Sequence, residues 1–593
     1  MSNKIVITGE GIVCAIGHDK ASVVDALLHG RTGIHAMKHL GSVHKELPVG
    51  EVDLSNDEMQ ALLGLGPSEE VSRTTMMGMM AVEQALIDAE INDGKDERGI
   101  KSQRIVLVSG TTVGGMDITE KYFGHLKVSD EHLDTLRHHD CGSCTHDIAN
   151  YFGIFDDCTT ISTACSSAAN AIVLGAQLLQ SGQADIVVAG GTEALSLFHL
   201  NGFNSLMILD KERCRPFDAT RAGLNLGEGA AYIVMEREDI AQQRNATIHA
   251  YLAGYGNACD AFHQTASSDN GEGAYLAMRE AIEMAGITVS TIDYVNAHGT
   301  GTPNNDLSES VALHRIFGND MPPVSSTKSH TGHTTSASGS IEAVICLLAM
   351  RHRFIPSNLG WQHAMEGGIL PSMGVSNIAL RYVLCNAFGF GGNDTSLLFS
   401  TQAPMVSLPA IHSNIALKEL SRVEVNTEED LKELKTYVSV LESRRMGKLM
   451  KASLLTSLKA LDIAGIERPD AIITATAMGC LENSECLLEQ IEAEGETSVK
   501  PTYFMQSTHN TLGSNIAIRT KCHGWNVTFT HGKQSLDWAL REAKMLLGSG
   551  RYKRVLVGVH DESTPLYRTL QDRLGESESP IVYSLSLILT CGE

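Results

Sequence analysis

TISTACSSAANAIVLGAQLL, at residues 160–179, decides the fold of this chain. A short β-prone run leads to Cys165, and a long apolar stretch with helical periodicity follows it at once. A thiol there would lie at the positive end of a helix, which we expect to lower its pKa and favour the thiolate. Ala164, Ser166 and Ser167 would leave room for a substrate. Since a lone cysteine beside a helix is more often buried and inert, other segments must carry the argument.

Strands and helices alternate on both sides of this segment. Strand-like apolar runs lie at 4–9, 104–110, 184–191 and 230–235, and helical periodicity lies at 76–91 and 166–182. This alternation predicts a layered α/β fold with buried sheets.

Length and composition exclude several classes of protein. A chain of 593 residues with 43% hydrophobic and 20% charged residues is typical of a globular protein with two or more packed units. The net charge of -24 and the lack of a basic cluster argue against nucleic acid as a partner. The N-terminal MSNKIVITGEG lacks the features of a signal peptide, and no apolar run reaches the length of a membrane span, so we expect a cytoplasmic protein. Thirteen scattered cysteines do not resemble a secreted disulfide framework.

A degenerate repeat links the two ends of the chain. The composition changes near residue 405, which predicts a module boundary there. Three segments before that boundary, at 76–91, 105–116 and 176–193, resemble 449–466, 471–481 and 543–562 in the same order. The tail is therefore predicted to be a second copy of the N-terminal half of the first module.

Two histidine segments accompany Cys165. VNAHGTGTPNNDLSES places His298 in a Gly/Thr-rich turn at the end of a strand. SSTKSHTGHTTSASGSIEAVICLLAM places Lys328 and His333 in a loop of small residues before an apolar helix. An isolated histidine is usually structural, but two in such loops together with a cysteine before a helix favour a nucleophilic active site.

With these segments the chain resembles a β-ketoacyl-acyl carrier protein synthase of the Cys-His-His type, in the thiolase-like superfamily. The resemblance covers about residues 3–400 and rests on motifs in the family's order and spacing, namely TACSS (163–167), GGTEA (190–194), RPFDATRAGLNLGEGAA (215–231), AHGTGTPNND (297–306), STKSHTGH (326–333) and NAFGFGGND (386–394). It implies a five-layered α/β/α/β/α sandwich. Residues 1–250 would form the half with the nucleophile and 251–405 the half with the two histidines.

The resemblance implies a decarboxylative Claisen condensation. Cys165 would carry the acyl chain as a thioester, and His298 and His333 would stabilise the enolate formed when a malonyl thioester loses carbon dioxide. The backbone amides of Cys165 and Phe390 would form an oxyanion hole, and Phe390 also matches the family's gating phenylalanine. Lys328 would orient the histidine loop or tune its charge, unless it forms a structural ion pair, for example with Glu309.

Other positions receive supporting roles from the resemblance. Asp260 and His263, in CDAFHQT, match a motif near the entrance of the active site. Phe388 is as compatible with simple packing as with gating. Glu342 lies in an apolar helix, near the position where the family sometimes binds a structural monovalent cation. We expect no other cofactor, because the substrates arrive on the phosphopantetheine of an acyl carrier protein.

The segment RHHDCGSCTHD, at 137–147, has the residue types of a zinc site. It contains Cys141 and Cys144 in C-x-x-C spacing, with histidines on both sides. A structural zinc site would require a second well-spaced pair of ligands, so we expect no metal in this protein.

The tail, residues 411–593, resembles the ketosynthase-like N-terminal half found in some bacterial polyketide and aryl-polyene pathways. The position equivalent to Cys165 falls on Lys533 or, with a one-residue gap, on Gln534, and neither is a cysteine. The chain ends without counterparts of His298, Lys328, His333 or the FGFGG loop. We therefore expect the tail to be inactive and to influence the choice of partner or the shape of the pocket.

Two alternatives remain at this stage. A thiolase would use a second cysteine as acid and base, but Cys385 precedes the FGFGG loop rather than lying within it. A non-catalytic scaffold is disfavoured by the intact Cys165, His298 and His333. The partners implied are an acyl carrier protein and either a second copy of the chain or another ketosynthase-like subunit. The pathway is fatty acid, polyketide or aryl-polyene biosynthesis.

Overall fold

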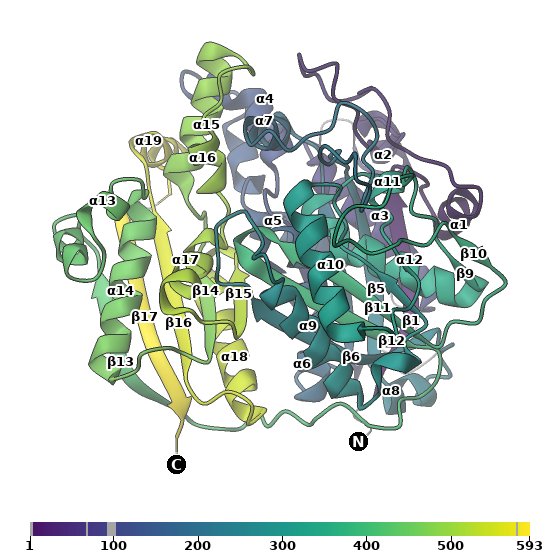
Figure 1. Cartoon of the computed structure of the whole chain (residues 1–593). Helices are drawn as coiled ribbons and strands as arrows, with labels where there is room; N and C mark the ends of the chain where they lie inside the picture. The colour runs from purple at the N-terminus through teal and green to yellow at the C-terminus, as the bar shows by residue number, and fades with distance from the viewer. Residues whose placement is uncertain (1–3, 67–68, 92–101, 577–578, 593) are drawn as a thin grey trace.

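One hydrogen-bonded series of fifteen strands runs through the chain (Figure 1). The computed structural model describes residues 4–66, 69–91, 102–576 and 579–592. The strands fall into three sets of five. The tail contributes the set at one end of the series, and the first module contributes the middle set and the set at the other end.

The middle set is built from the first 240 residues. Its order across the sheet is β3 (Asp157–Ile161), β2 (Ile105–Gly110), β4 (Ile186–Glu193), β5 (Gly229–Arg237) and β1 (Ile5–Cys14). β2 is parallel to β3 and β4, whereas β5 is antiparallel to β4 and β1. Helices α3 (Arg73–Asp88) and α5 (Cys141–Phe152) cover the outer side, and α6 (Ser167–Gln180) covers the inner side. These strands are buried along almost their whole length, because helices cover both faces of the sheet.

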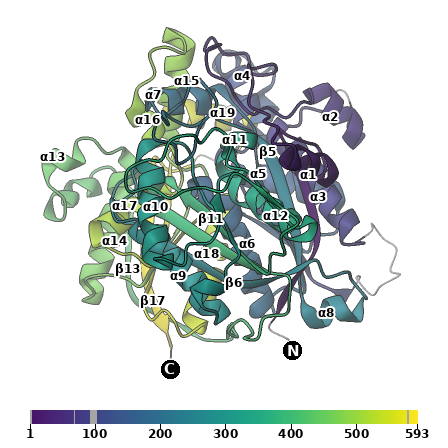
Figure 2. The same ribbon diagram turned by 45° about the vertical axis from the view of Figure 1, so that its right-hand side comes forward.

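The second half of the first module repeats this arrangement. Its strands are β6 (Ala250–Cys259), β12 (Asn393–Ser400), β11 (Tyr382–Gly389), β7 (Tyr294–Asn296) and β8 (Val324–Ser325). Helix α12 (Ser338–His352) packs against α6 between the sheets, and α9 (Glu272–Ala285) and α10 (Pro303–Phe317) form the outer layer (Figure 2). The predicted five layers are therefore present. Helices α6 and α12 are buried almost all round because they form the central layer.

The tail has the same strand order as the middle set. It runs β15 (Trp525–Phe529), β14 (Ala471–Ala475), β16 (Val555–Glu562), β17 (Val582–Cys591) and β13 (Leu417–Val425). Its helices are α14 (Lys448–Ala464), α15 (Leu481–Glu494), α16 (Pro501–Met505), α17 (Thr511–Thr520), α18 (Ser535–Gly548) and α19 (Pro565–Leu574). This order confirms the predicted repeat.

Strands β15 and β3 join the two modules. They pair antiparallel at Phe529 and Ile161, and the backbone N–H of Thr530 donates to the carbonyl of Thr160 at 3.1 Å. One apolar core continues across the joint and includes Trp538 of α18. The tail therefore covers an edge of the sheet that would otherwise expose unpaired backbone groups.

Short elements complete the fold. They are α1 (Lys20–Leu28), α2 (Asn56–Leu63), α4 (Met116–Leu126), α7 (Leu197–Ser205), α8 (Glu238–Gln243), α11 (Lys328–Thr331), α13 (Val440–Ser443), and the hairpin strands β9 (Phe354–Ile355) and β10 (Val375–Ser376). Polar caps fix several helix starts; for example, the side chain of Asp140 accepts from the N–H of Ser143 before α5. Within the described ranges, no helix is both long and apolar enough to cross a bilayer.

Candidate active site

A tight turn between β3 and α6 holds Cys165. The turn is the 3₁₀ segment Ala164–Ser166, and Ala164 has a left-handed backbone conformation with φ of 52°. The hydroxyl of Ser167 accepts from the N–H of Thr163 at 2.9 Å and donates to the carbonyl of Ala164 at 2.6 Å. These bonds stabilise a conformation that is unfavourable for a residue with a Cβ atom. The small side chain of Ala164 therefore limits the strain of this turn, and it also leaves room for a substrate beside the thiol.

The pKa of Cys165 departs from expectation. Burial raises it to about 11, although the backbone N–H groups of Phe390 and of Cys165 itself and the charge of Lys328 act in the opposite direction. The prediction of a lowered pKa is wrong, because the start of α6 is desolvated and the loss of solvent outweighs the favourable helix end. The resting site therefore holds a neutral thiol.

Both predicted histidines lie beside Cys165. His333 Nε2 is 3.1 Å from the Cys165 sulfur, and the ring centroids of His333 and His298 are 5.3 Å apart at an interplanar angle of 83°. His298 follows β7, while His333 follows α11, so two turns from the second half meet the nucleophile of the first half. The sulfur of Cys165 and ring nitrogens of both histidines lie within 4.8 Å of one another, although more than a hundred residues separate each histidine from Cys165 along the chain.

Lys328 fixes the proton position on His298. Its Nζ is 3.3 Å from His298 Nδ1 and 2.5 Å from the Glu342 carboxylate. An ammonium group can only donate, so Nδ1 of His298 accepts and the proton lies on Nε2. Lys328 therefore forms an ion pair and also contacts the histidine.

The predicted ion pair of Lys328 with Glu309 is wrong, because Lys328 pairs with Glu342. The Glu309 carboxylate instead accepts the backbone N–H of His298 at 2.9 Å and that of Gly299 at 2.7 Å. Glu309 lies on α10 and shapes the turn that presents His298. Sequence spacing alone could not distinguish the two buried glutamates, because the choice depends on how α10 and α12 pack.

Both imidazoles are neutral. Burial is the main cause that lowers the pKa of each ring well below its ordinary value, and the charge of Lys328 lowers it further. His333 differs from His298 in its second partner, since its Nδ1 lies 3.3 Å from the hydroxyl of Ser338. A hydroxyl can donate or accept, so His333 can hold its proton on either nitrogen.

The FGFGG loop closes over the sulfur. A Cβ on Gly389 would lie 2.8 Å from the carbonyl oxygen of Thr163 and 3.2 Å from the nitrogen of Cys165, so a larger residue does not fit. The Phe390 ring stacks on Phe203 with centroids 5.7 Å apart. Phe388 instead packs near His298, with ring centroids 5.9 Å apart.

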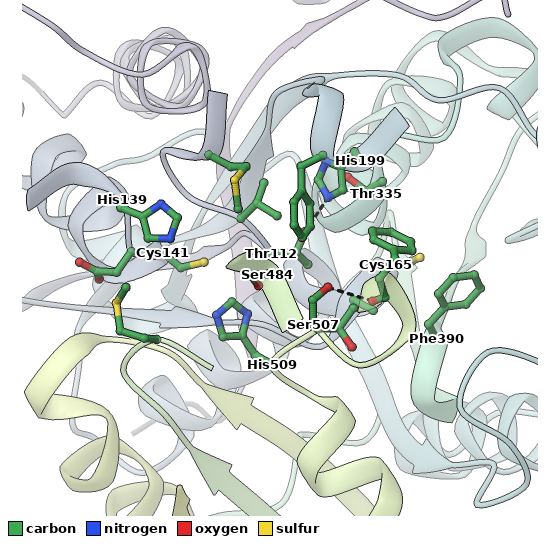
Figure 3. Close-up of a pocket in the computed structure, with 18 of the residues that line it drawn as sticks. Thr112, His139, Cys141, Cys165, His199, Thr335, Phe390, Ser484, Ser507 and His509 are labelled. Atoms are coloured by element: carbon green, nitrogen blue, oxygen red, sulfur yellow. Dashed lines mark hydrogen bonds between the residues drawn. The ribbon is translucent and has the colours of Figure 1, made fainter. Parts of the chain in front are cut away.

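Two cavities meet at Cys165 and Phe390. The outer one is bounded by the histidines, by the FGFGG loop and by residues of the 265–267 and 302–305 segments. The inner one leads away from Cys165 into the joint between the modules (Figure 3). In Figure 3, Cys165 and Phe390 lie at one end and His139 and Cys141 at the other. The Phe390 ring thus lies between an outer and an inner chamber.

The tail supplies one wall of the inner cavity. Its lining residues from the tail are Ala477, Met478, Ser484, Phe504, Ser507, Thr508 and His509. From the first module, His199, Phe203 and Thr335 also line it. Sequence reasoning missed all of these residues, because lining depends on how the tail docks. The repeat was the only available signal, since it marked the tail as a possible partner for the first module.

The remaining predicted residues lie around the site. The Asp260 carboxylate accepts from the backbone N–H of Ser268 and Gly273 and lies on the outer cavity. His263 is exposed and its Nδ1 accepts from two nearby backbone N–H groups. Glu342 is buried against Lys328.

Comparison with known families agrees with this geometry. The description "Beta-ketoacyl synthase, N-terminal domain" matches residues 2–241, and "Beta-ketoacyl synthase, C-terminal domain" matches 249–362. A second N-terminal domain of this kind matches residues 420–593. The 3-oxoacyl-[acyl-carrier-protein] synthase 2 of Vibrio cholerae is 30% identical over 416 residues, which cover 67% of this chain and 98% of that protein.

The chain belongs to the β-ketoacyl synthase family. These proteins are condensing enzymes of the acyltransferase class. The nodulation protein E of Rhizobium meliloti is also 30% identical, over 67% of this chain and 99% of its own length.

Solved β-ketoacyl synthase structures extend the comparison. The ishigamide ketosynthase/chain length factor is 28% identical over 68% of this chain and all of that chain, with a TM-score of 0.62. The PfaC keto synthase-chain length factor covers all of this chain with a TM-score of 0.78 and 78% of its own length, at 16% identity. The second similarity concerns the fold, and it includes the tail.

Proposed function

We propose that this β-ketoacyl synthase extends an acyl chain held on Cys165 by decarboxylative condensation with a malonyl group on an acyl carrier protein. The observation that carries the proposal is the convergence of a buried thiol and two neutral imidazoles at the junction of two cavities. The outer cavity would admit the phosphopantetheine arm, and the inner cavity would hold the growing chain.

Acyl transfer to Cys165 is the first step. The thiol attacks the carbonyl carbon of an acyl-carrier thioester, a new carbon–sulfur bond forms, and the pantetheine sulfur leaves. The proton of Cys165 passes through His333 Nε2, which is 3.1 Å from the sulfur, to the departing pantetheine sulfur. Since the resting thiol is neutral, this proton transfer is needed for nucleophilic attack.

Decarboxylation is the second step. The bond between the malonyl carboxylate carbon and Cα breaks, carbon dioxide leaves, and the electron pair forms an enolate on the thioester. His298 donates from Nε2 to the developing oxyanion, because Lys328 holds the other nitrogen as an acceptor. His333 donates beside it from Nε2 in its other tautomer, in which Nδ1 accepts from the Ser338 hydroxyl; to reach this tautomer, the ring loses the proton on Nδ1 to solvent and takes one from solvent on Nε2.

Condensation is the third step. The enolate carbon attacks the acyl carbonyl on Cys165, and the resulting oxyanion accepts from the backbone N–H groups of Cys165 and Phe390. This attack forms the new carbon–carbon bond. Collapse of the tetrahedral intermediate re-forms the carbonyl, breaks the bond to sulfur and releases the Cys165 thiolate, which takes up a proton from solvent. None of these steps requires a cofactor beyond the phosphopantetheine of the carrier. A structural monovalent cation near Glu342 stays a prediction.

Intact-mass analysis tests the proposal directly. Incubation of the purified full-length protein with an acyl-carrier thioester should add one acyl group, and peptide mapping should place it on Cys165. Addition of malonyl-carrier should then release carbon dioxide and form a β-ketoacyl-carrier. Absence of both the adduct and carbon dioxide would favour a non-catalytic scaffold.

We further propose that the tail replaces the partner subunit expected from the family resemblance. It pairs with the β3 edge and completes the inner cavity from within the same chain. Another ketosynthase-like subunit, or a second copy of this chain, would have to bind a different surface. We place the tail in the role of an inactive half-module that sets the space available to the acyl chain.

A point substitution at Ser484 tests this role better than truncation does, because the tail shares an apolar core with the first module. Ser484 lines both the inner cavity and a second, more apolar cavity beyond His139. Ser484→Phe should shorten the products while Cys165 still becomes acylated. Glu489→Phe, at an exposed position of the same helix, is the control. Products of unchanged length from Ser484→Phe would contradict the proposal.

A further inference from the structure

A cluster of potential metal ligands lies at the joint between the two modules, away from the histidines of the active site. His146 comes from α5 and Cys158 from β3, whereas His531 lies two residues after β15, just before the 3₁₀ segment Gly532–Gln534. All three lie beside the backbone pairing that joins β3 to β15. The cluster therefore combines two ligands from the first module with one from the tail.

The two sulfur–nitrogen distances within the cluster are close to those of a zinc site, and the rings of His146 and His531 lie 4.3 Å apart at an interplanar angle of 30°. Cys158 Sγ lies 3.4 Å from His146 Nδ1 and 3.7 Å from His531 Nε2. Bonds of about 2.3 Å to sulfur and about 2.05 Å to nitrogen, at tetrahedral angles, separate the two ligand atoms by about 3.6 Å. The possible ligand atoms of all three side chains lie within 4.8 Å of one another.

The hydrogen bonds of His531 direct a lone pair into the cluster. The Thr160 hydroxyl donates to Thr145 at 2.6 Å, so it accepts from His531 Nδ1 at 3.1 Å. This places the proton on Nδ1 and leaves Nε2 free to bind a metal. Outer partners of this kind orient the histidine ligands of zinc sites.

We propose that His146, Cys158 and His531 bind one zinc ion that fastens the tail to the first module. The site has three protein ligands, and the partly exposed His146 provides an approach from solvent for the ion and for a water molecule as fourth ligand. Cys158 releases its proton on binding. The sequence predicts no metal in the segment 137–147, which contains Cys141, Cys144 and His146. Of these three residues only His146 belongs to the cluster, and its two partners come from β3 and from the tail.

The repeat does not reproduce the cluster at the equivalent positions of the two modules. When β3 and β15 are aligned as equivalent strands of the repeat, Asn526 is equivalent to Cys158 and Thr163 is equivalent to His531. Neither residue type is a usual zinc ligand. The cluster is therefore a feature of this joint rather than a consequence of the shared fold.

Metal analysis of the full-length protein tests the proposal. The protein is stripped with a chelator, incubated with zinc chloride and separated from free zinc. About one zinc per chain should remain on the unmodified protein, and Cys158→Ser and His531→Gln should retain only background zinc. Cys591→Ser removes an exposed cysteine and should bind zinc as the unmodified protein does. Cobalt(II) in place of zinc should show a thiolate-to-cobalt absorption band that disappears in Cys158→Ser.

A second variant separates metal binding from simple packing. Thr160→Val removes the acceptor for His531 Nδ1 and should weaken zinc binding about tenfold. Circular dichroism and acylation of Cys165 check that each variant is folded. If the unmodified protein retains no more zinc than Cys158→Ser, the three residues form only a thiol–imidazole hydrogen-bond cluster and the proposal is wrong.

Discussion

The turn that carries Cys165 and the turn that carries Lys533 have the same backbone and different chemistry. Ala164 has φ of 52° and Gly532 has φ of 54°, and each begins a 3₁₀ segment that leads into a long helix. The hydroxyl of Ser535 accepts from a backbone N–H at 2.7 Å and donates to the Gly532 carbonyl at 2.8 Å. Ser167 makes the same two bonds in the first module.

This equivalence assigns the nucleophile position of the tail to Lys533 rather than to Gln534. The tail thus keeps the fold of the nucleophile turn and lacks a thiol there. The tail matches an N-terminal β-ketoacyl synthase domain, whereas the histidine turns and the FGFGG loop of the first module belong to its second half. The comparison shows that the fold positions a residue, while reactivity depends on the groups that a second half brings to it.

Removing the cysteine from the first turn and placing one at the equivalent position of the second has the largest expected effect. Cys165→Ala should abolish acylation and reduce condensation by about a thousandfold or more, because it removes the thiol that lies beside both histidines. Adding Lys533→Cys to that variant should not restore an acyl adduct. Intact mass spectrometry and product formation check both outcomes. An adduct at position 533 would show that the turn alone is sufficient for acyl transfer.

Removing one imidazole should have the next largest effect. His298→Ala or His333→Ala should slow carbon dioxide release from malonyl-carrier by about 10²–10³-fold, since each removes a donor to the enolate oxygen. His314→Ala changes an exposed histidine of α10 and serves as the control. Full activity in either active-site variant would remove that histidine from the mechanism.

Much of the fold and of the chemistry could be predicted from local sequence. The strand before Cys165 is encoded by a short β-prone run and the helix after it by a long apolar run, and Gly-rich segments mark the loops that approach the sulfur. The repeat predicted the tail because the same elements recur in the same order. These features depend on neighbours along the chain.

Features set by packing could not be predicted in this way. The partner of Lys328 depends on which helix faces it, and the pKa of Cys165 depends on how completely its turn is buried. The wall contributed by Ser507 and His509 depends on the pairing of β3 with β15. Each of these follows from contacts between segments that are far apart in the sequence.

The raised pKa of Cys165 predicts a steep pH dependence of alkylation. With a pKa of about 11, the thiolate fraction at Cys165 should rise about tenfold per pH unit below that value, and iodoacetamide should react about 100-fold faster at pH 9 than at pH 7. Peptide mapping isolates the rate at Cys165 from that of exposed Cys591. A rate that levels off near pH 7 would instead support the lowered pKa expected from the helix end.

The smallest expected effect concerns the contact between the tail and the FGFGG loop. Asn510 Nδ2 donates to the carbonyl of Phe390 at 2.8 Å and to Asn393 Oδ1 at 2.6 Å, so a residue of the inactive module supports the loop beside the nucleophile. Loss of such a bond costs about 1 kcal/mol, and Asn510→Ala should therefore lower kcat about fivefold with little change in KM. Asn414→Ala, at an exposed position before β13, should leave both unchanged. If kcat is unaffected by Asn510→Ala, the tail acts only as a wall of the pocket, and the loop is held by the first module alone.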